Sequence, residues 1–106
     1  NHGGRQLDGA SSTINILPEI VDKVGKLVEV HLDGGIRSGQ DVIKAMCLGA
    51  KGTYIGRAFL YGLGALGKEG VTRALSIIKT EADMTMALCG RRDIHDLNRD
   101  NIYYPK

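Results

Sequence analysis

The sequence predicts an α/β fold in which short parallel strands alternate with helices. Apolar runs with the period of a strand alternate with longer apolar patterns that have the period of a helix. Glycines stand at the ends of these runs, where turns belong, and a polar segment follows each predicted strand. Strands that alternate with helices pair in parallel through right-handed crossovers. Because two strands do not make a stable sheet, we expect the 106 residues to be the C-terminal piece of a larger body.

The first half of the chain is predicted to run from a loop through helix, strand and helix. Residues 1–12 are polar and rich in glycine, which is typical of a loop. Apolar residues at helical spacing, closed by Gly25, predict a helix over 13–24. Alternating residues predict a strand over 27–32, and an apolar stripe predicts a second helix over 39–49.

The second half begins with a short predicted strand over 52–55. An apolar segment broken by glycines, 59–66, is expected to be a connector or a short helical turn that leads to the longest helix, 68–89. Residues 91–106 form a polar tail rich in Asp, Asn and Arg, and 1–106 are treated as one domain. The apolar residues expected to hold the tail on the body are Ile94, Leu97, Ile102, Tyr103 and Tyr104.

Composition and charge are those of a globular protein and exclude several function classes. Hydrophobic residues make up 42% and charged residues 25% of the chain. The net charge of +2 is too small, and the basic residues too scattered, to indicate a nucleic-acid partner. No apolar run approaches the roughly 20 residues of a membrane span. Cys47 and Cys89 lie in predicted helices and indicate buried thiols in a reducing, cytoplasmic compartment, with no metal site.

The opening stretch, 1–9, places a histidine three residues before an arginine among glycines. Histidine is the side chain whose unperturbed pKa lies nearest to neutral pH, so a histidine at position 2 suits proton abstraction. The planar guanidinium of Arg5 suits a carboxylate, which it can bind through two parallel hydrogen bonds. Together they predict a base beside an anion clamp, fit for a small acid that loses a proton and two electrons. The alternative is a polar loop whose His2 and Arg5 merely face water.

Two later segments predict a phosphate site. Gly34, Gly35 and Gly39 let a ligand approach the backbone where a helix begins, and Arg37 adds a positive charge. After the next strand, Gly56 and Arg57 repeat this combination. Glycine and arginine at consecutive strand ends fit one phosphate held by the last two loops of a (β/α)8 barrel. The alternative is a pair of ordinary turns with surface arginines.

Asp33 ends the first predicted strand, directly before these glycines. Its carboxylate is expected both to cap the following turn and to accept hydrogen bonds from ligand hydroxyl groups.

At these residues the chain resembles the FMN-dependent α-hydroxy-acid oxidases and dehydrogenases, the family of glycolate oxidase and of lactate and mandelate dehydrogenases. Residues 1–8 resemble the active-site signature of that family after strand six. Residues 33–37 and 56–57 resemble its flavin-phosphate motifs after strands seven and eight. The resemblance covers nearly the whole chain and implies the C-terminal part of a (β/α)8 barrel, from the loop after strand six to the last helix and tail.

The resemblance also implies a role for each site residue. His2 is the expected catalytic base, and Arg5 is expected to bind the substrate carboxylate. The residues expected to hold the ribityl and phosphate parts of FMN are Asp33, Gly34, Gly35, Ile36, Arg37, Gly56 and Arg57. The chain departs from the family pattern at Ser38, where many members have a second arginine, and at Ala58, where the oxidases often have proline. Ala58 favours a dehydrogenase.

The expected activity is therefore FMN-dependent oxidation of an (S)-2-hydroxy acid to the 2-oxo acid, within a complete barrel. The expected partners are the hydroxy acid, the remainder of the barrel and further copies in a homo-oligomer. Some relatives are attached to a membrane, through a segment outside these residues. Two alternatives stay open: another FMN- or phosphate-binding barrel enzyme, and a non-catalytic fragment that is active only with a partner chain.

Overall fold

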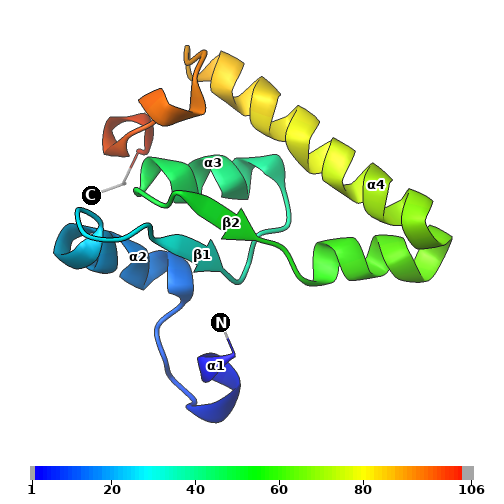
Figure 1. Cartoon of the computed structure of the whole chain (residues 1–106), viewed down its shortest axis with the longest axis horizontal. Helices are drawn as coiled ribbons and strands as arrows, with labels where there is room; N and C mark the ends of the chain where they lie inside the picture. The colour runs from blue at the N-terminus through cyan, green and yellow to red at the C-terminus, as the bar shows by residue number, and fades with distance from the viewer. Residues whose placement is uncertain (1, 104–106) are drawn as a thin grey trace.

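A computed structural model of the chain describes residues 2–103, so Asn1 of the opening motif and Tyr104 of the tail lie outside the described residues. Strands and helices alternate as predicted, and α3 lies between the two strands and the second half of α4 (Figure 1). The main elements are α1 (Gly3–Gln6), α2 (Thr13–Val24), β1 (His31–Asp33), α3 (Gly39–Cys47), β2 (Gly52–Tyr54) and α4 (Arg57–Leu88). Two short 3-10 turns follow, η1 (Ile94–Asp96) and η2 (Arg99–Asn101).

The two strands pair in parallel, with His31 opposite Gly52 and Asp33 opposite Tyr54. Their carboxyl ends therefore meet at one edge, as parallel pairing requires. Leu32 points into the core and is only 3% exposed, whereas His31 and Asp33, on the other face of β1, are exposed. The helices thus cover one face of this two-stranded sheet.

The prediction that the first strand begins at residue 27 was wrong by four residues. The amides of Leu27 and Val28 both donate to the carbonyl of Val24, at 2.8 and 3.0 Å, so the chain is still turning after α2. The side chains of Leu27 and Val28 are exposed, and the strand begins only at His31.

The core consists of two adjoining clusters. One gathers α2, the sheet and α3 around six buried residues, Leu17, Leu32, Ile36, Ala45, Leu48 and Ala50. The other joins α3 to α4 and the tail through Ile43, Cys47 and Leu97. The first cluster includes Ile36, so it holds the loop that leaves β1 against the core.

The segment 59–66, predicted as a connector or a short helical turn, belongs to the first part of α4, which begins at Arg57. The backbone leaves helical geometry only at Leu66 and Gly67, where Gly67 has φ +58°. The helix folds back there so tightly that a side chain at Gly62 or Gly70 would overlap the backbone of the other. The two glycines are therefore required by the close approach of the two halves of α4.

The tail is held as predicted at Leu97, which is buried, and at the half-buried Ile94 and Ile102. The prediction for Tyr103 was wrong, since this side chain is 87% exposed. Cys89 lies just beyond α4 and is exposed rather than buried, whereas Cys47 is buried and its burial raises the pKa of its thiol.

Candidate active site

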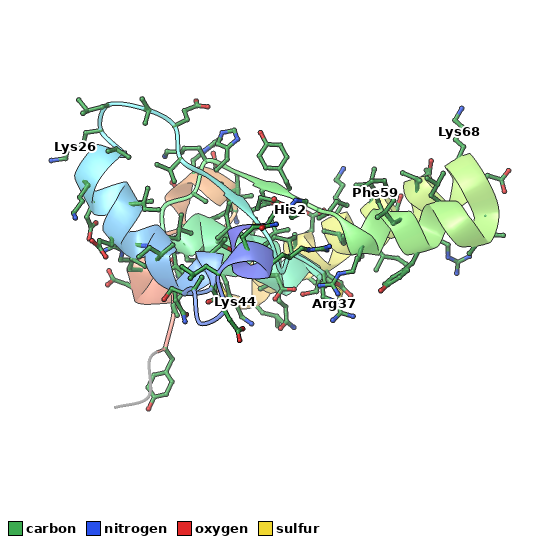
Figure 2. All side chains as sticks on the ribbon, turned by 90° about the horizontal axis from the view of Figure 1, so that it is seen from below. His2, Lys26, Arg37, Lys44, Phe59 and Lys68 are labelled. Atoms are coloured by element: carbon green, nitrogen blue, oxygen red, sulfur yellow. The ribbon has the colours of Figure 1, made fainter. Side chains whose placement is uncertain are left out.

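The opening segment is not the predicted loop throughout, because residues 3–6 form one turn of helix, α1. The amide of Arg5 donates to the carbonyl of His2 at 3.0 Å, and that of Leu7 donates to Gly3 at 3.0 Å. Side chains three positions apart in such a turn are neighbours, so the turn brings His2 and Arg5 to one side. Both are exposed, and neither side chain is bonded to another described residue. Figure 2 looks onto this side of the molecule.

A cleft of about 350 Å³ separates α1 from the loop that follows β1. Gly3 and Gly4 of α1 line one part of it, and Gly34 and Gly35 line another. Residues 10–14, which connect α1 to α2, complete the lining. The opening motif and the first phosphate motif therefore share one hollow, although more than 20 residues of sequence separate them.

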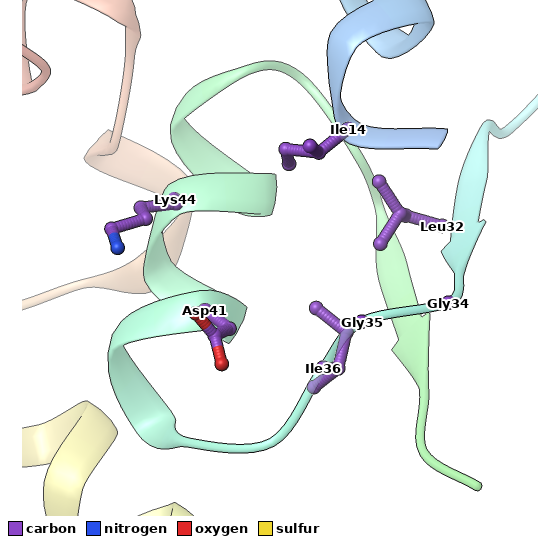
Figure 3. A pocket seen from close by; sticks show the side chains of 7 residues that line it. All are labelled: Ile14, Leu32, Gly34, Gly35, Ile36, Asp41 and Lys44. Atoms are coloured by element: carbon purple, nitrogen blue, oxygen red, sulfur yellow. The ribbon is translucent and has the colours of Figure 1, made fainter. Parts of the chain in front are cut away.

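A smaller hollow of about 210 Å³ continues behind Gly34 and Gly35, between their loop and α3 (Figure 3). Leu32 and Ile36 point toward it from one side, and Asp41 and Lys44 belong to α3 on the other. The hydroxyl of Thr13 donates to the carbonyl of Gly34 at 3.4 Å, which ties the start of α2 to this loop.

The loop after β1 has the backbone that a close ligand approach needs. Gly34 and Gly35 have φ of +108° and +82°, a left-handed region that other residues enter only with strain. Nothing lies within 4 Å of the place where a Cβ on Gly35 would stand. Ile36 is 4% exposed and packs in the core, so only its backbone can meet a cofactor. The guanidinium of Arg37 is exposed and has no partner among the described residues.

Asp33 does not cap the following turn, so that part of its predicted role was wrong. Its carboxylate is exposed and is hydrogen-bonded to none of the described residues. It stands at the carboxyl end of β1, beside Tyr54 of β2, with its oxygens available to a ligand.

The start of α3 differs from the expectation that its open amides attract the phosphate. The Ser38 hydroxyl accepts the amide of Asp41 at 3.2 Å and caps the helix. The Asp41 carboxylate accepts the Ser38 hydroxyl at 2.9 Å and the amide of Arg37 at 3.1 Å. Glu81, reaching from α4, accepts the amide of Gly39 at 2.8 Å. Three protein oxygens, two of them from carboxylates, therefore already accept backbone amides at the start of α3.

These roles of Ser38, Asp41 and Glu81 were not predicted from the sequence. A serine three positions before an acidic residue, at a helix start, is a capping pattern that identifies Ser38 and Asp41. Glu81 lies 42 positions from its partner Gly39, and no local pattern reveals it.

The start of α4 behaves as the phosphate prediction requires. Its first residue follows Gly56, and no side chain caps it. The first amides of a helix have no partner within the helix, so those of Arg57 and Ala58 point outward with the positive end of the helix dipole. Nothing lies within 4 Å of a Cβ built on Gly56, and the Arg57 side chain is exposed and unpaired among the described residues.

The cleft, the glycine loop and the uncapped start of α4 match a known pattern. The family model described as FMN-dependent dehydrogenase matches residues 1–104. This chain belongs to that family. The description of the family indicates FMN as the cofactor, and the matched span includes every predicted site residue.

The relatives are enzymes. The chain is 51% identical to an L-lactate dehydrogenase from Caulobacter vibrioides, over 92% of this chain and 26% of that protein. It is 48% identical to human 2-hydroxyacid oxidase 1, over 93% of this chain and 27% of that protein. A soluble mutant of the membrane-associated (S)-mandelate dehydrogenase from Pseudomonas putida superposes with a TM-score of 0.88 at 46% identity, over 95% of this chain and 28% of that one.

The chain thus spans little more than a quarter of the length of these relatives. Its fold is that of the C-terminal part of a (β/α)8 barrel, as the sequence predicted. Within residues 2–103, no helix combines the length and the apolar character that crossing a bilayer needs.

Proposed function

We propose that these residues form the C-terminal part of a complete barrel that oxidises an (S)-2-hydroxy acid to the 2-oxo acid. The observation that carries the proposal is the cleft shared by Gly3 and Gly4 with Gly34 and Gly35. The proposal assigns the base and the anion clamp to His2 and Arg5, which flank Gly3 and Gly4 in the sequence. The names of the relatives above, which cover lactate, mandelate and 2-hydroxy acids in general, support the substrate class.

The residues at the carboxyl ends of the two strands and in the loops that follow them fit FMN. The open backbone at Gly35 and Gly56 leaves room for a phosphate, and the exposed guanidinium groups of Arg37 and Arg57 supply charge to hold it. The free carboxylate of Asp33 suits the ribityl hydroxyl groups, which are hydrogen-bond donors. When bound, FMN supplies the acceptor for the two electrons that leave the substrate.

His2 and Arg5 divide the work on the substrate. Arg5 binds the carboxylate through its planar guanidinium, and this fixes the direction of the adjacent α-carbon. His2, in its neutral form, takes up one of the two protons that the hydroxy acid loses on becoming an oxo acid. They stand three positions apart at one helical turn and so face the same side, which suits a small substrate.

An assay of the complete enzyme with lactate, mandelate and glycolate and a dye as final electron acceptor tests the activity. We expect dye reduction with at least one of these acids and, for the chiral ones, only with the (S)-enantiomer. An enzyme that binds FMN but reduces no dye with any of them contradicts the substrate class and favours another barrel reaction.

A non-catalytic role for the 106 residues alone is the second candidate, favoured by the large apolar side chains that they expose, such as Leu27 and Leu88. Gel filtration with flavin absorbance separates the two. A yellow species well above 11.4 kDa indicates a completed barrel, and a colourless monomer indicates a piece that needs its partner.

A further inference from the structure

One contact outside the cleft links the last helix to the loop that carries Arg37. A carboxylate oxygen of Glu81, in the second half of α4, accepts a hydrogen bond from the amide of Gly39 at 2.8 Å. Gly39 is the first residue of α3, two positions after Arg37. Glu81 is half-buried, so this bond is partly shielded from water.

The packing of backbone on backbone fixes this contact. Gly39 is buried, and a side chain there would overlap the backbone of Glu81 and Ala82. The start of α3 therefore lies directly against α4. Because the two backbones are so close, the Glu81 side chain spans only a short distance to the amide of Gly39. Its carboxylate is therefore restricted to few positions.

Two further amides near Gly39 are also paired. Asp41 accepts the amide of Arg37, and Ser38 accepts the amide of Asp41. The loop is thus held by hydrogen bonds at Arg37, at Gly39 and at Asp41, and the bond at Gly39 comes from α4. The Thr13 hydroxyl holds the other end of the loop, at Gly34. Without Glu81, one amide at the positive end of the α3 dipole would be open to an anion.

We propose that Glu81 is a positioning residue for the flavin phosphate, an inference that rests on the proposed function. Its carboxylate occupies the start of α3, keeps the phosphate away from that helix end, and sets the position of Arg37. The phosphate is thereby directed to Arg37 and to the uncapped start of α4 at Arg57. The helix α4 then has two roles. Its first turn provides the anion site, and Glu81 in its second half restrains the loop that carries Arg37.

The test compares the affinities of the complete enzyme for FMN and for riboflavin, which lacks the phosphate, by quenching of flavin fluorescence. Glu81→Ala removes the restraint on the loop that carries Arg37, and we expect the dissociation constant of FMN to rise about tenfold. We expect that of riboflavin to stay unchanged. Glu81→Gln restores FMN binding, because its amide oxygen accepts the same hydrogen bond. Asp83→Ala, which removes an exposed carboxylate from the same helix, is the matched control.

Equal losses for FMN and riboflavin in Glu81→Ala, or no loss for either, overturn the inference. If Glu81→Ala does not fold, Glu81→Asp decides instead, because its carboxylate is one methylene too short for the bond and the same selective loss of FMN is expected. A wild-type enzyme that binds no FMN contradicts the proposed function itself. A wild-type enzyme that binds FMN while its Glu81 variants keep full affinity contradicts only the role of Glu81.

Discussion

Arg99 binds both carboxylate oxygens of Asp22, at 2.6 and 3.2 Å, although the two residues lie 77 positions apart. A guanidinium nitrogen of Arg99 also donates to the carbonyl of Pro18 at 3.2 Å. These bonds join η2 in the tail to α2, the helix whose first residues line the cleft. The hydrogen bond from Arg99 holds the pKa of the Asp22 carboxyl below its usual value of 3.8.

Asp22→Asn is expected to loosen the tail at neutral pH. A carboxyl group whose pKa is lowered by folding contributes stability above its usual pKa, and that contribution is lost as the pH falls through the lowered value. Hydrogen exchange at Asn101 and Ile102, whose amides close the η2 turn, should therefore be faster in the variant at pH 7.

The difference from the unchanged protein should disappear at a pH below the lowered pKa of Asp22. Glu19→Gln is the control, because Glu19 lies on the same helix but pairs only with Lys23 on the surface. Equal exchange in Asp22→Asn and in the unchanged protein at pH 7 contradicts a role of this pair in holding the tail.

Ser38→Ala is expected to destabilise the fold by about 1 kcal/mol, within a range of roughly 0.5–2 kcal/mol for the loss of a helix cap. The hydroxyl of Ser38 is the acceptor for the Asp41 amide, and alanine leaves that amide without it. Urea unfolding measures the change as a lower midpoint with an unchanged slope. Ser76→Ala, at an exposed position inside α4, should cause no loss. A midpoint equal to that of the unchanged protein contradicts the capping role.

The elements that the sequence predicted well are those in which periodicity and turn residues agree. The helix at Thr13–Val24 has the predicted bounds, and α3 and β2 differ from the prediction by one or two residues at one end. The strand at His31–Asp33 was predicted too long, because β-branched and apolar residues at 27–30 fit a strand locally while hydrogen bonds to Val24 hold part of them in a turn. Local patterns cannot show that competition.

The same limit holds at the candidate site. Residues such as His2, Arg37 and Arg57 stand out because their chemistry is unusual beside glycines. In the sequence, Glu81 cannot be told apart from a charged helix residue that faces water. Its role depends on the close packing of α3 against α4 at Gly39, which the sequence does not reveal. The break in α4 at Leu66 and Gly67, by contrast, falls at the predicted boundary between the segment 59–66 and the last helix, because glycines mark it in the sequence.

Arg57→Ala in the complete enzyme is expected to weaken the retention of FMN. Arg57 begins α4, so alanine removes a charge from the helix end while the outward-pointing amides remain. Flavin absorbance after dialysis measures the cofactor that stays bound, and we expect a clear loss. Arg73→Ala, at an exposed position further along α4, is the control for a change of net charge. Full retention of FMN by Arg57→Ala counts against the phosphate role.

His2→Gln in the complete enzyme should lower turnover about 10²- to 10⁴-fold, the usual cost of losing general-base catalysis. FMN should remain bound, because His2 precedes α1 whereas the expected cofactor residues stand at the carboxyl ends of the two strands and in the loops after them. Steady-state assays with dye give kcat and KM, and flavin absorbance gives the cofactor content.

The loss in His2→Gln should fall on kcat rather than on KM, since Arg5 still binds the substrate carboxylate. His95→Gln, in the exposed η1 turn, is the matched control and should leave both constants unchanged. Near-normal turnover in His2→Gln would show that another group removes the proton, and the cleft between α1 and the glycine loop would then need a different base.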